Sequence, residues 1–225
     1  SFIKGRRDKV TITSKFGVVP PVLNMKTKAA MPVARLVTKF LPKIQERLKK
    51  KSGEMLAERN FDVDYARRCL DLSLTELATD YIDIYLIHEP DAVSLENPEE
   101  LIDFLDNAVM DGKIRRWGFA YKSVKDYEWA STLGGDVIQF EGNIQTLPVC
   151  GAILSDPRQR IVTRPFVGGL DNNFLKNLLE DLHLTENFRA LGASFSDISL
   201  CLSHILSGKS GSVLCSMFDV SRSEE

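Results

Sequence analysis

The sequence predicts an α/β fold and, within that class, a (β/α)₈ barrel. Short runs rich in β-branched residues alternate with amphipathic stretches, an order typical of parallel strands joined by helical crossovers. The first run is followed by Lys15-Phe16-Gly17 and not by the GxGxxG turn of an open dinucleotide-binding sheet, which favours the barrel. The chain has 225 residues, of which 44% are apolar, so it can bury the core of one large domain.

Six strands and five helices are expected from the local patterns. The strands are short runs of high β propensity at 10–14, 81–87, 115–119, 136–140, 160–164 and 212–216. The helix expected at 62–78 begins with an aspartate cap and repeats apolar residues at spacings of three and four, as does the helix at 99–110. Less regular patterns predict helices at 124–131, 172–182 and 195–206.

A complete barrel has eight strands, with about 31 residues in each βα unit. Because six strands are found, two units, on the order of 60 residues, are expected to be absent from this sequence. Residues 18–60 are expected to form a long basic loop insert within a single partial barrel domain that covers 1–225. The insert could be a lid over a pocket or a docking surface for an acidic partner, and the sequence leaves both open.

The net charge of −2 conceals a strong asymmetry along the chain. Residues 26–51 carry nine Lys or Arg and one acid, whereas 62–111 carry fourteen acids and two arginines. Few aromatics are interleaved with the lysines, so a solvated helix face is favoured over a nucleic-acid surface. The four cysteines are far apart without a CxxC, and no apolar run reaches the roughly 18 residues of a membrane span. We therefore expect a cytoplasmic protein without a metal site, a nucleic-acid partner or a membrane segment; the oligomeric state is not predicted.

Five segments resemble successive landmarks of one enzyme family. They are TSKFG at 13–17, SLTELATDYIDIYLIHEPD at 73–91, GKIRRWGFA at 112–120, VIQFEGN at 137–143 and RPFVGGL at 164–170. Their order and spacing are similar to strands three to eight of the aldo-keto reductases, over nearly the whole chain apart from 18–60. The resemblance implies a TIM barrel that reduces aldehydes or ketones to alcohols with NADPH, with NADH the less favoured nucleotide.

The family uses Asp, Tyr, Lys and His, and the tyrosine protonates the carbonyl oxygen. By resemblance, Lys15 is the catalytic lysine, whose ammonium lowers the pKa of the tyrosine from its usual value of about 10. His88 matches the histidine, which orients the substrate carbonyl and can donate a hydrogen bond to it. The two strands that carry Lys15 and His88 are expected to be neighbours.

The cofactor contacts are expected further along the chain. Gln139 matches the glutamine that hydrogen-bonds the nicotinamide carboxamide. Gly168 and Gly169 lie where barrels bind phosphate through backbone N–H groups. Arg164 and Arg222 are further candidates, the latter for an adenosine phosphate, because a guanidinium can pair with phosphate through two hydrogen bonds.

The sequence departs from the family in two places. The family's Asp and Tyr come from its first two βα units, so the resemblance assigns no proton donor here, and the expected Ser-Asn pair after the third run reads Ala120-Tyr121. Three interpretations stay open: part of an ordinary reductase, an inactive remnant that binds a nucleotide or a protein partner, or a reductase in which Tyr121 replaces the missing tyrosine. Tyr121 and Lys125 also form the YxxxK spacing of short-chain dehydrogenases, which arises easily by chance.

Overall fold

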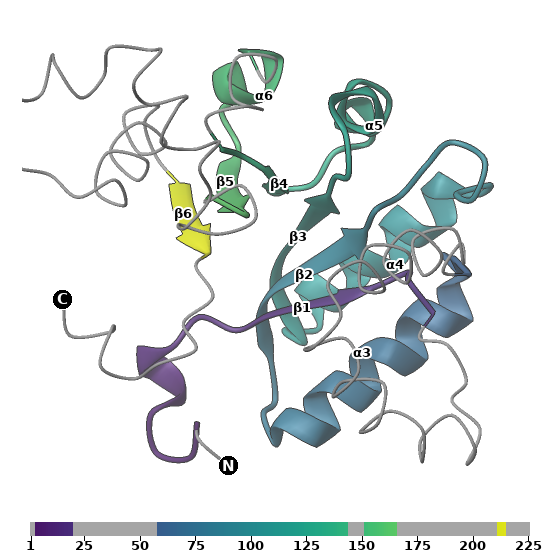
Figure 1. The fold of residues 1–225 in the computed structure, drawn as a ribbon. Helices are drawn as coiled ribbons and strands as arrows, with labels where there is room; N and C mark the ends of the chain where they lie inside the picture. The colour runs from purple at the N-terminus through teal and green to yellow at the C-terminus, as the bar shows by residue number, and fades with distance from the viewer. Residues whose placement is uncertain (1–2, 20–57, 144–150, 166–210, 215–225) are drawn as a thin grey trace, which may run out of the picture.

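The computed structural model describes residues 3–19, 58–143, 151–165 and 211–214, and every structural statement below concerns these residues. Their six strands form one sheet in the order β1-β2-β3-β4-β5-β6, with every neighbouring pair parallel (Figure 1). The strands are β1 Thr13–Phe16, β2 Ile82–His88, β3 Ile114–Ala120, β4 Val137–Glu141, β5 Gln159–Thr163 and β6 Gly211–Leu214. The predicted α/β class with parallel strands is confirmed.

The first strand begins three residues later than predicted, because contacts outside the sheet fix the residues before it. Arg7, in the short 3-10 helix η1 (Arg7–Lys9), donates to the carbonyl oxygens of Val10 and Tyr81 at 3.0 and 2.9 Å. The backbone N–H of Ile12 donates to the Asp83 carboxylate at 2.8 Å and so is not available to a neighbouring strand. Strand β5 ends one residue earlier than predicted, because the next residue, Arg164, has a φ of 53° and is not extended.

The helices follow the signals in their sequences. Helix α3 (Val63–Leu77) is capped by Asp62, whose side chain accepts from two backbone N–H groups, and it ends at Ala78 in the left-handed conformation. Helix α4 (Pro98–Met110) begins with proline, and α5 (Val124–Ala130) begins with a capping box of Ser123 and Asp126. Helix α6 (Gly151–Ser155) and the 3-10 helix η2 (Ser131–Leu133) were not predicted, since both are too short to show a period. The helices predicted at 172–182 and 195–206, and most of the insert predicted at 18–60, lie outside the described residues.

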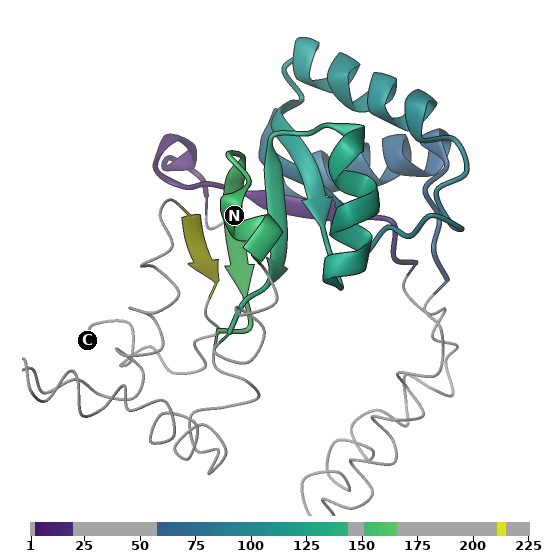
Figure 2. The same cartoon turned by 90° about the horizontal axis from the view of Figure 1, so that it is seen from above.

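The two faces of the sheet have different surroundings. On one face Phe16, Tyr85 and Phe119 pack with residues of α3 and α4, such as Leu70 and Leu105. Figure 2 shows α3 and α4 together on one side of the sheet. The opposite face, here called the inner face, carries a smaller apolar cluster of Ile84, Leu86, Ala120, Val137 and Ile161. Side chains alternate between these faces along each strand, so the register determines which residues share the inner face.

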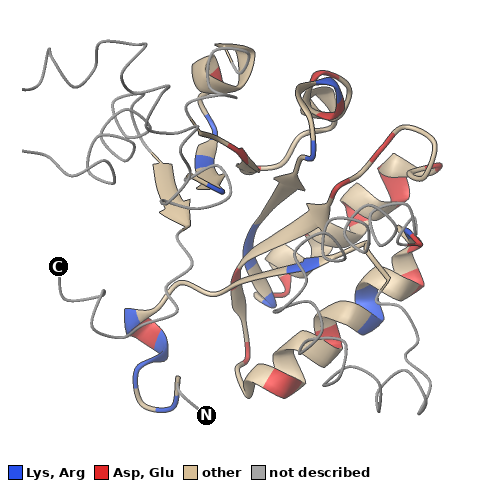
Figure 3. Ribbon diagram, in the orientation of Figure 1, with Lys and Arg blue, Asp and Glu red and all other residues tan. Residues whose placement is uncertain are grey.

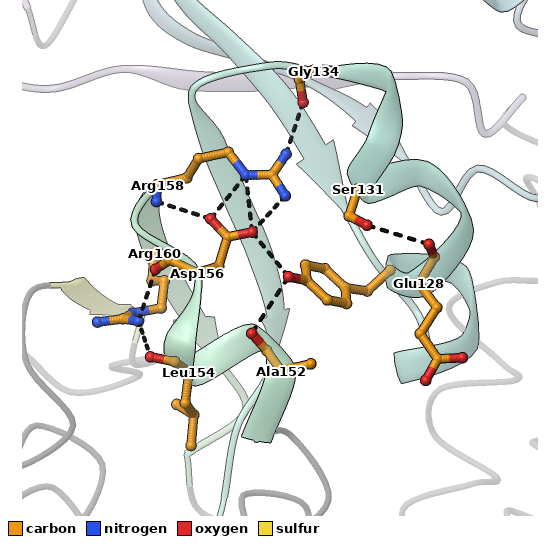
Figure 4. Close-up of polar contacts among 9 residues, drawn as sticks. Glu128, Ser131, Gly134, Ala152, Leu154, Asp156, Arg158 and Arg160 are labelled. Atoms are coloured by element: carbon orange, nitrogen blue, oxygen red, sulfur yellow. Dashed lines mark hydrogen bonds and ion pairs between the residues drawn. The ribbon is translucent and has the colours of Figure 1, made fainter.

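A polar network joins α5, α6 and the residues that precede β5. The Arg158 guanidinium donates to both oxygens of Asp156, at 2.9 Å from Nε to Oδ1 and 2.6 Å from Nη2 to Oδ2, and to the Gly134 carbonyl at 2.8 Å (Figure 4). The Tyr127 hydroxyl of α5 donates to the same carboxylate at 2.9 Å. This network joins three elements that are separate in sequence. It lies before the first residues of β4 and β5, away from the carboxyl ends of the strands where barrel active sites are built, which assigns it to stability.

None of the helices in the described ranges is long and apolar enough to span a bilayer.

Candidate active site

The predicted lysine and histidine come from neighbouring strands and lie toward the carboxyl edge of the sheet. Lys15 is the third residue of β1, and His88 is the last residue of β2. Lys15 is opposite Leu86 in the parallel register, so His88 lies two residues further along on the same inner face. Strand spacings of about 4.8 Å and a rise of about 3.3 Å per residue separate the two Cα atoms by about 8 Å. Side chains this close can contact one small molecule.

The Lys15 ammonium has no hydrogen bond or ion pair to any other described residue, whereas its backbone is part of the pairing of β1 with β2. Although its side chain reaches the surface, desolvation lowers the pKa of its ammonium, while the negative charge of Glu89 acts to raise it. An ammonium without a permanent partner keeps its donors for a ligand. The negative charge of the Glu89 carboxylate favours the charged form of the Lys15 ammonium.

The imidazole of His88 is half-buried. Its pKa is lowered mainly by desolvation and then by the positive charge of Lys15, with Glu89 opposing and Arg59 adding to the effect. The ring is therefore neutral near pH 7, and a neutral imidazole can donate one hydrogen bond to a carbonyl oxygen.

Gln139 lies in the same row of the inner face as His88. The register pairs His88 with Ala120 and Ala120 with Gln139, so two strand spacings, about 10 Å, separate the histidine from the glutamine. Gln139 is 2% exposed, and within the described part of the chain neither its amide oxygen nor its amide nitrogen has a hydrogen-bond partner. Buried amides are nearly always satisfied, so this one fits a ligand that offers both a donor and an acceptor, such as a primary carboxamide.

The other predicted cofactor residues have different outcomes. Arg164 follows β5 at the carboxyl edge, with its side chain 78% exposed and Nη1 3.1 Å from an oxygen of Glu141. Its guanidinium is thus at the correct edge, although it already has an ion-pair partner. Gly168, Gly169 and Arg222 lie outside the described residues, and their assignment stays a prediction.

Tyr121 does not lie at the mouth of the barrel, so the hypothesis that it replaces the missing tyrosine is wrong. It follows Phe119 on the helix side of the sheet, stacks on that ring at 5.8 Å and meets Tyr127 edge-on at 5.4 Å. Burial raises the pKa of Tyr121, and Arg158 lies near its hydroxyl without a well-aligned hydrogen bond. The YxxxK interpretation is also wrong, because Tyr121 precedes the start of α5 and shares no helix face with Lys125.

All five tyrosines of the chain are among the described residues, and none is on the inner face at the carboxyl edge. Tyr65 is in α3, Tyr81 precedes β2 and stacks under Arg7, and Tyr85 points into the helix-side core, where it donates to the Ala66 carbonyl at 3.3 Å. With Tyr121 and Tyr127 also in that core, these five positions offer no phenol to a substrate beside Lys15.

Two charged residues were not assigned to the site from the sequence. Glu89 directly follows His88. Arg59, in the segment that precedes α3, forms an ion pair with Glu89, with 3.4 Å between its Nη2 and the Glu89 Oε2. Figure 3 shows the acidic segment immediately after the β2 arrow. A charge that follows a strand was a usable signal for Glu89, whereas Arg59 has no periodicity or motif around it. Within the described ranges no three or more His, Cys, Asp or Glu residues are grouped to hold a metal ion.

Comparison with known proteins identifies the family. A model of the aldo/keto reductase family matches residues 1–147, which include β1 to β4 and with them Lys15, His88 and Gln139. The chain belongs to the aldo/keto reductase family. The resemblance found in the sequence is therefore confirmed.

Individual relatives of this aldo/keto reductase chain were also found. The 6-dehydroglucose reductase of Novosphingobium aromaticivorans is 46% identical over 55 residues, which are 24% of this chain and 17% of that protein. A solved aldo/keto reductase from Klebsiella pneumoniae, in complex with NADP and acetate, gives a TM-score of 0.58 at 18% identity over 98% of this chain and 64% of that one. The apo form of an aldo-keto reductase from Bacillus halodurans gives 0.59 at 15% identity, over 98% and 66%.

These likenesses confirm the predicted barrel class at the level of the fold. The chain spans 64% to 66% of the length of these two solved structures and 17% of the curated relative.

Proposed function

We propose that Lys15, His88 and Gln139 form the lysine–histidine part and the nicotinamide-facing part of a carbonyl reductase site that uses NADPH. The observation that carries the proposal is their placement in one face of the sheet, at the edge where the strands end. Active sites of parallel barrels are built at this edge. Family membership and the NADP bound to the Klebsiella relative support the choice of nucleotide.

The residues present fit the nicotinamide group. The unpartnered buried amide of Gln139 can both donate to and accept from the carboxamide of the ring. NADPH, when bound, supplies a hydride. His88 would donate a hydrogen bond to the oxygen of a small aldehyde or ketone and so orient it, and the Lys15 ammonium would stabilise negative charge that develops beside that oxygen.

A second candidate function is nucleotide binding without reduction. The position of the five tyrosines favours it for this chain, because none of them can protonate a carbonyl oxygen at the inner face. Both candidates require NADPH to bind.

Nucleotide binding tests what the two candidates share. We expect NADPH to bind the 225-residue chain more tightly than NADH does, as measured by quenching of the fluorescence of Trp117 and Trp129. Gln139→Leu removes both amide contacts and should weaken NADPH binding about tenfold. Asn107→Leu is the control, because that amide is exposed on α4, which covers the face of the sheet opposite to Gln139. An unchanged dissociation constant in Gln139→Leu would contradict the assignment.

Turnover tests the placement of the five tyrosines. Because none of them offers a proton donor at the inner face, we expect the 225-residue chain to oxidise no NADPH above the protein-free rate with a panel of aldehydes. Both candidates allow this result, since Lys15, His88 and Gln139 are proposed as only part of a reductase site. Turnover that is abolished in Lys15→Met would instead support the reductase, with a donor other than tyrosine. Turnover that disappears in Tyr121→Phe would contradict the position of that ring in the core on the helix side of the sheet.

A further inference from the structure

Glu89 has an uncommon backbone conformation for its residue type. Its φ is 51°, in the left-handed region, although it is not a glycine. The backbone N–H of Glu89 donates to the Ala120 carbonyl at 2.8 Å, which continues the pairing of β2 with β3 for one residue past the strand. Among the described non-glycine residues, Ala78 and Arg164 also have positive φ, and Ala78 is explained as the cap of α3. Such strain persists where the surroundings hold it, and it is concentrated at functional sites.

Arg59 is the residue that holds the Glu89 side chain. Its guanidinium pairs with Glu89 at 3.4 Å through one nitrogen and with Asp91 through the other. Asp91 is itself fixed, because it accepts from the backbone N–H groups of Val93 and Ser94 at 3.1 and 2.9 Å. The arginine therefore has one firm anchor, and it orients Glu89 from that anchor.

The same arginine is joined to the residues that directly follow the strand carrying the lysine. The backbone of Arg59 forms an antiparallel bridge with Val18. On either side of that bridge, Val19 donates to the Glu58 carbonyl and Asn60 donates to the Gly17 carbonyl, both at 2.8 Å. Arg59 thus links the residues that follow β1 to those that follow β2, the two strands that carry Lys15 and His88.

The charges around this space are balanced. Two positive groups, Lys15 and Arg59, lie with two negative groups, Glu89 and Asp91, around a histidine that is neutral near pH 7. The charged groups that act on His88 are Lys15, Glu89 and Arg59, and Glu89 is the acid among them. It is also the acid that acts on Lys15.

We propose that Arg59 and Glu89 are a positioning pair for the Lys15 and His88 site: Arg59 fixes the place of the Glu89 carboxylate, and Glu89 balances the ammonium of Lys15 beside the imidazole. The inference rests on the proposed function only in taking Lys15 and His88 as parts of a reductase site. The ion pair of Arg59 and Glu89 is observed independently of that function.

Proton titration of His88 by NMR tests the pair in the full 225-residue chain without nucleotide, so that its outcome is separate from that of the NADPH experiment. The chain has three histidines, and His88→Gln identifies the signal. Glu89→Gln removes the negative charge and should move the His88 midpoint to lower pH. This shift should shrink at high salt. The matched control is Glu96→Gln, an exposed acid on the same loop, which should leave the midpoint unchanged.

The double variant tests whether Arg59 acts by positioning Glu89. The shift caused by Glu89→Gln should be smaller when Arg59 is already glutamine, because an unheld carboxylate spends less time beside the site. Glu89→Asn is a second neutral variant whose side chain tolerates the left-handed backbone, in case the glutamine does not fold. An unchanged midpoint in the neutral Glu89 variant, or equal shifts in both Arg59 backgrounds, would overturn the proposal.

Discussion

Gly118→Ala is expected to lower the free energy of unfolding by about 3 kcal/mol or more. A Cβ atom at this position in β3 would lie 1.8 Å from the carbonyl oxygen of Val137 and 2.7 Å from its carbonyl carbon. Both are backbone atoms of the adjacent strand, so no side-chain rotation can relieve the overlap. The two strands must separate, which disturbs the pairing of Gly118 with Val137 and of Ala120 with Gln139.

Urea unfolding followed by tryptophan fluorescence measures this effect, since Trp117 is buried beside the glycine. Gly151→Ala is the control, because a Cβ there meets no atom within 4 Å and the residue begins α6. It should be neutral or stabilise the protein by up to about 1 kcal/mol. Equal urea midpoints for Gly118→Ala and the unsubstituted chain would show that β3 and β4 are not so closely apposed. Because Gln139 lies on β4, the NADPH affinity of any folded Gly118→Ala protein should also fall.

Asp156→Asn is expected to remove about 2 kcal/mol of stability at pH 7. The side chain is 7% exposed, and its hydrogen bonds from Arg158 lower the pKa of the carboxyl to about 2, from an ordinary value of 3.8. A carboxyl whose pKa is lower in the folded state than in the unfolded state stabilises the fold at pH values above its pKa in the unfolded chain. That stabilisation is lost as the pH falls from about 4 to about 2.

The pH dependence distinguishes this network from a general loss of packing. The unfolding free energy of the unsubstituted chain should fall more steeply between pH 4 and 2 than that of Asp156→Asn, and the two curves should converge near pH 2. Asp103→Asn, on the exposed side of α4, is the control and should follow the unsubstituted chain throughout. Parallel curves for Asp156→Asn and the unsubstituted chain would contradict the lowered pKa of Asp156.

The elements that sequence reasoning predicted well are those whose own residues specify them. Helix α3 has its aspartate cap and its apolar spacing within one segment, and β2 is a continuous apolar run, so both were found within one residue of their observed ends. The carboxyl ends of the strands are also local features. For this reason the sequence predicts that Lys15, His88 and Gln139 lie at one edge of the sheet.

Contacts between distant segments decided the rest. The start of β1 depends on Arg7 and Asp83, which are 76 residues apart, and the direction of the Tyr121 ring depends on packing against α5. The pairing of Arg59 with Glu89 joins residues 30 apart through a bridge to the end of β1. Local periodicity carries no information about such pairs, because their energy arises only when the folded sheet brings the partners together. The sequence by itself therefore determined the family, the order of the strands and the residue types at the carboxyl edge, and the tertiary structure determined which of them face the same space.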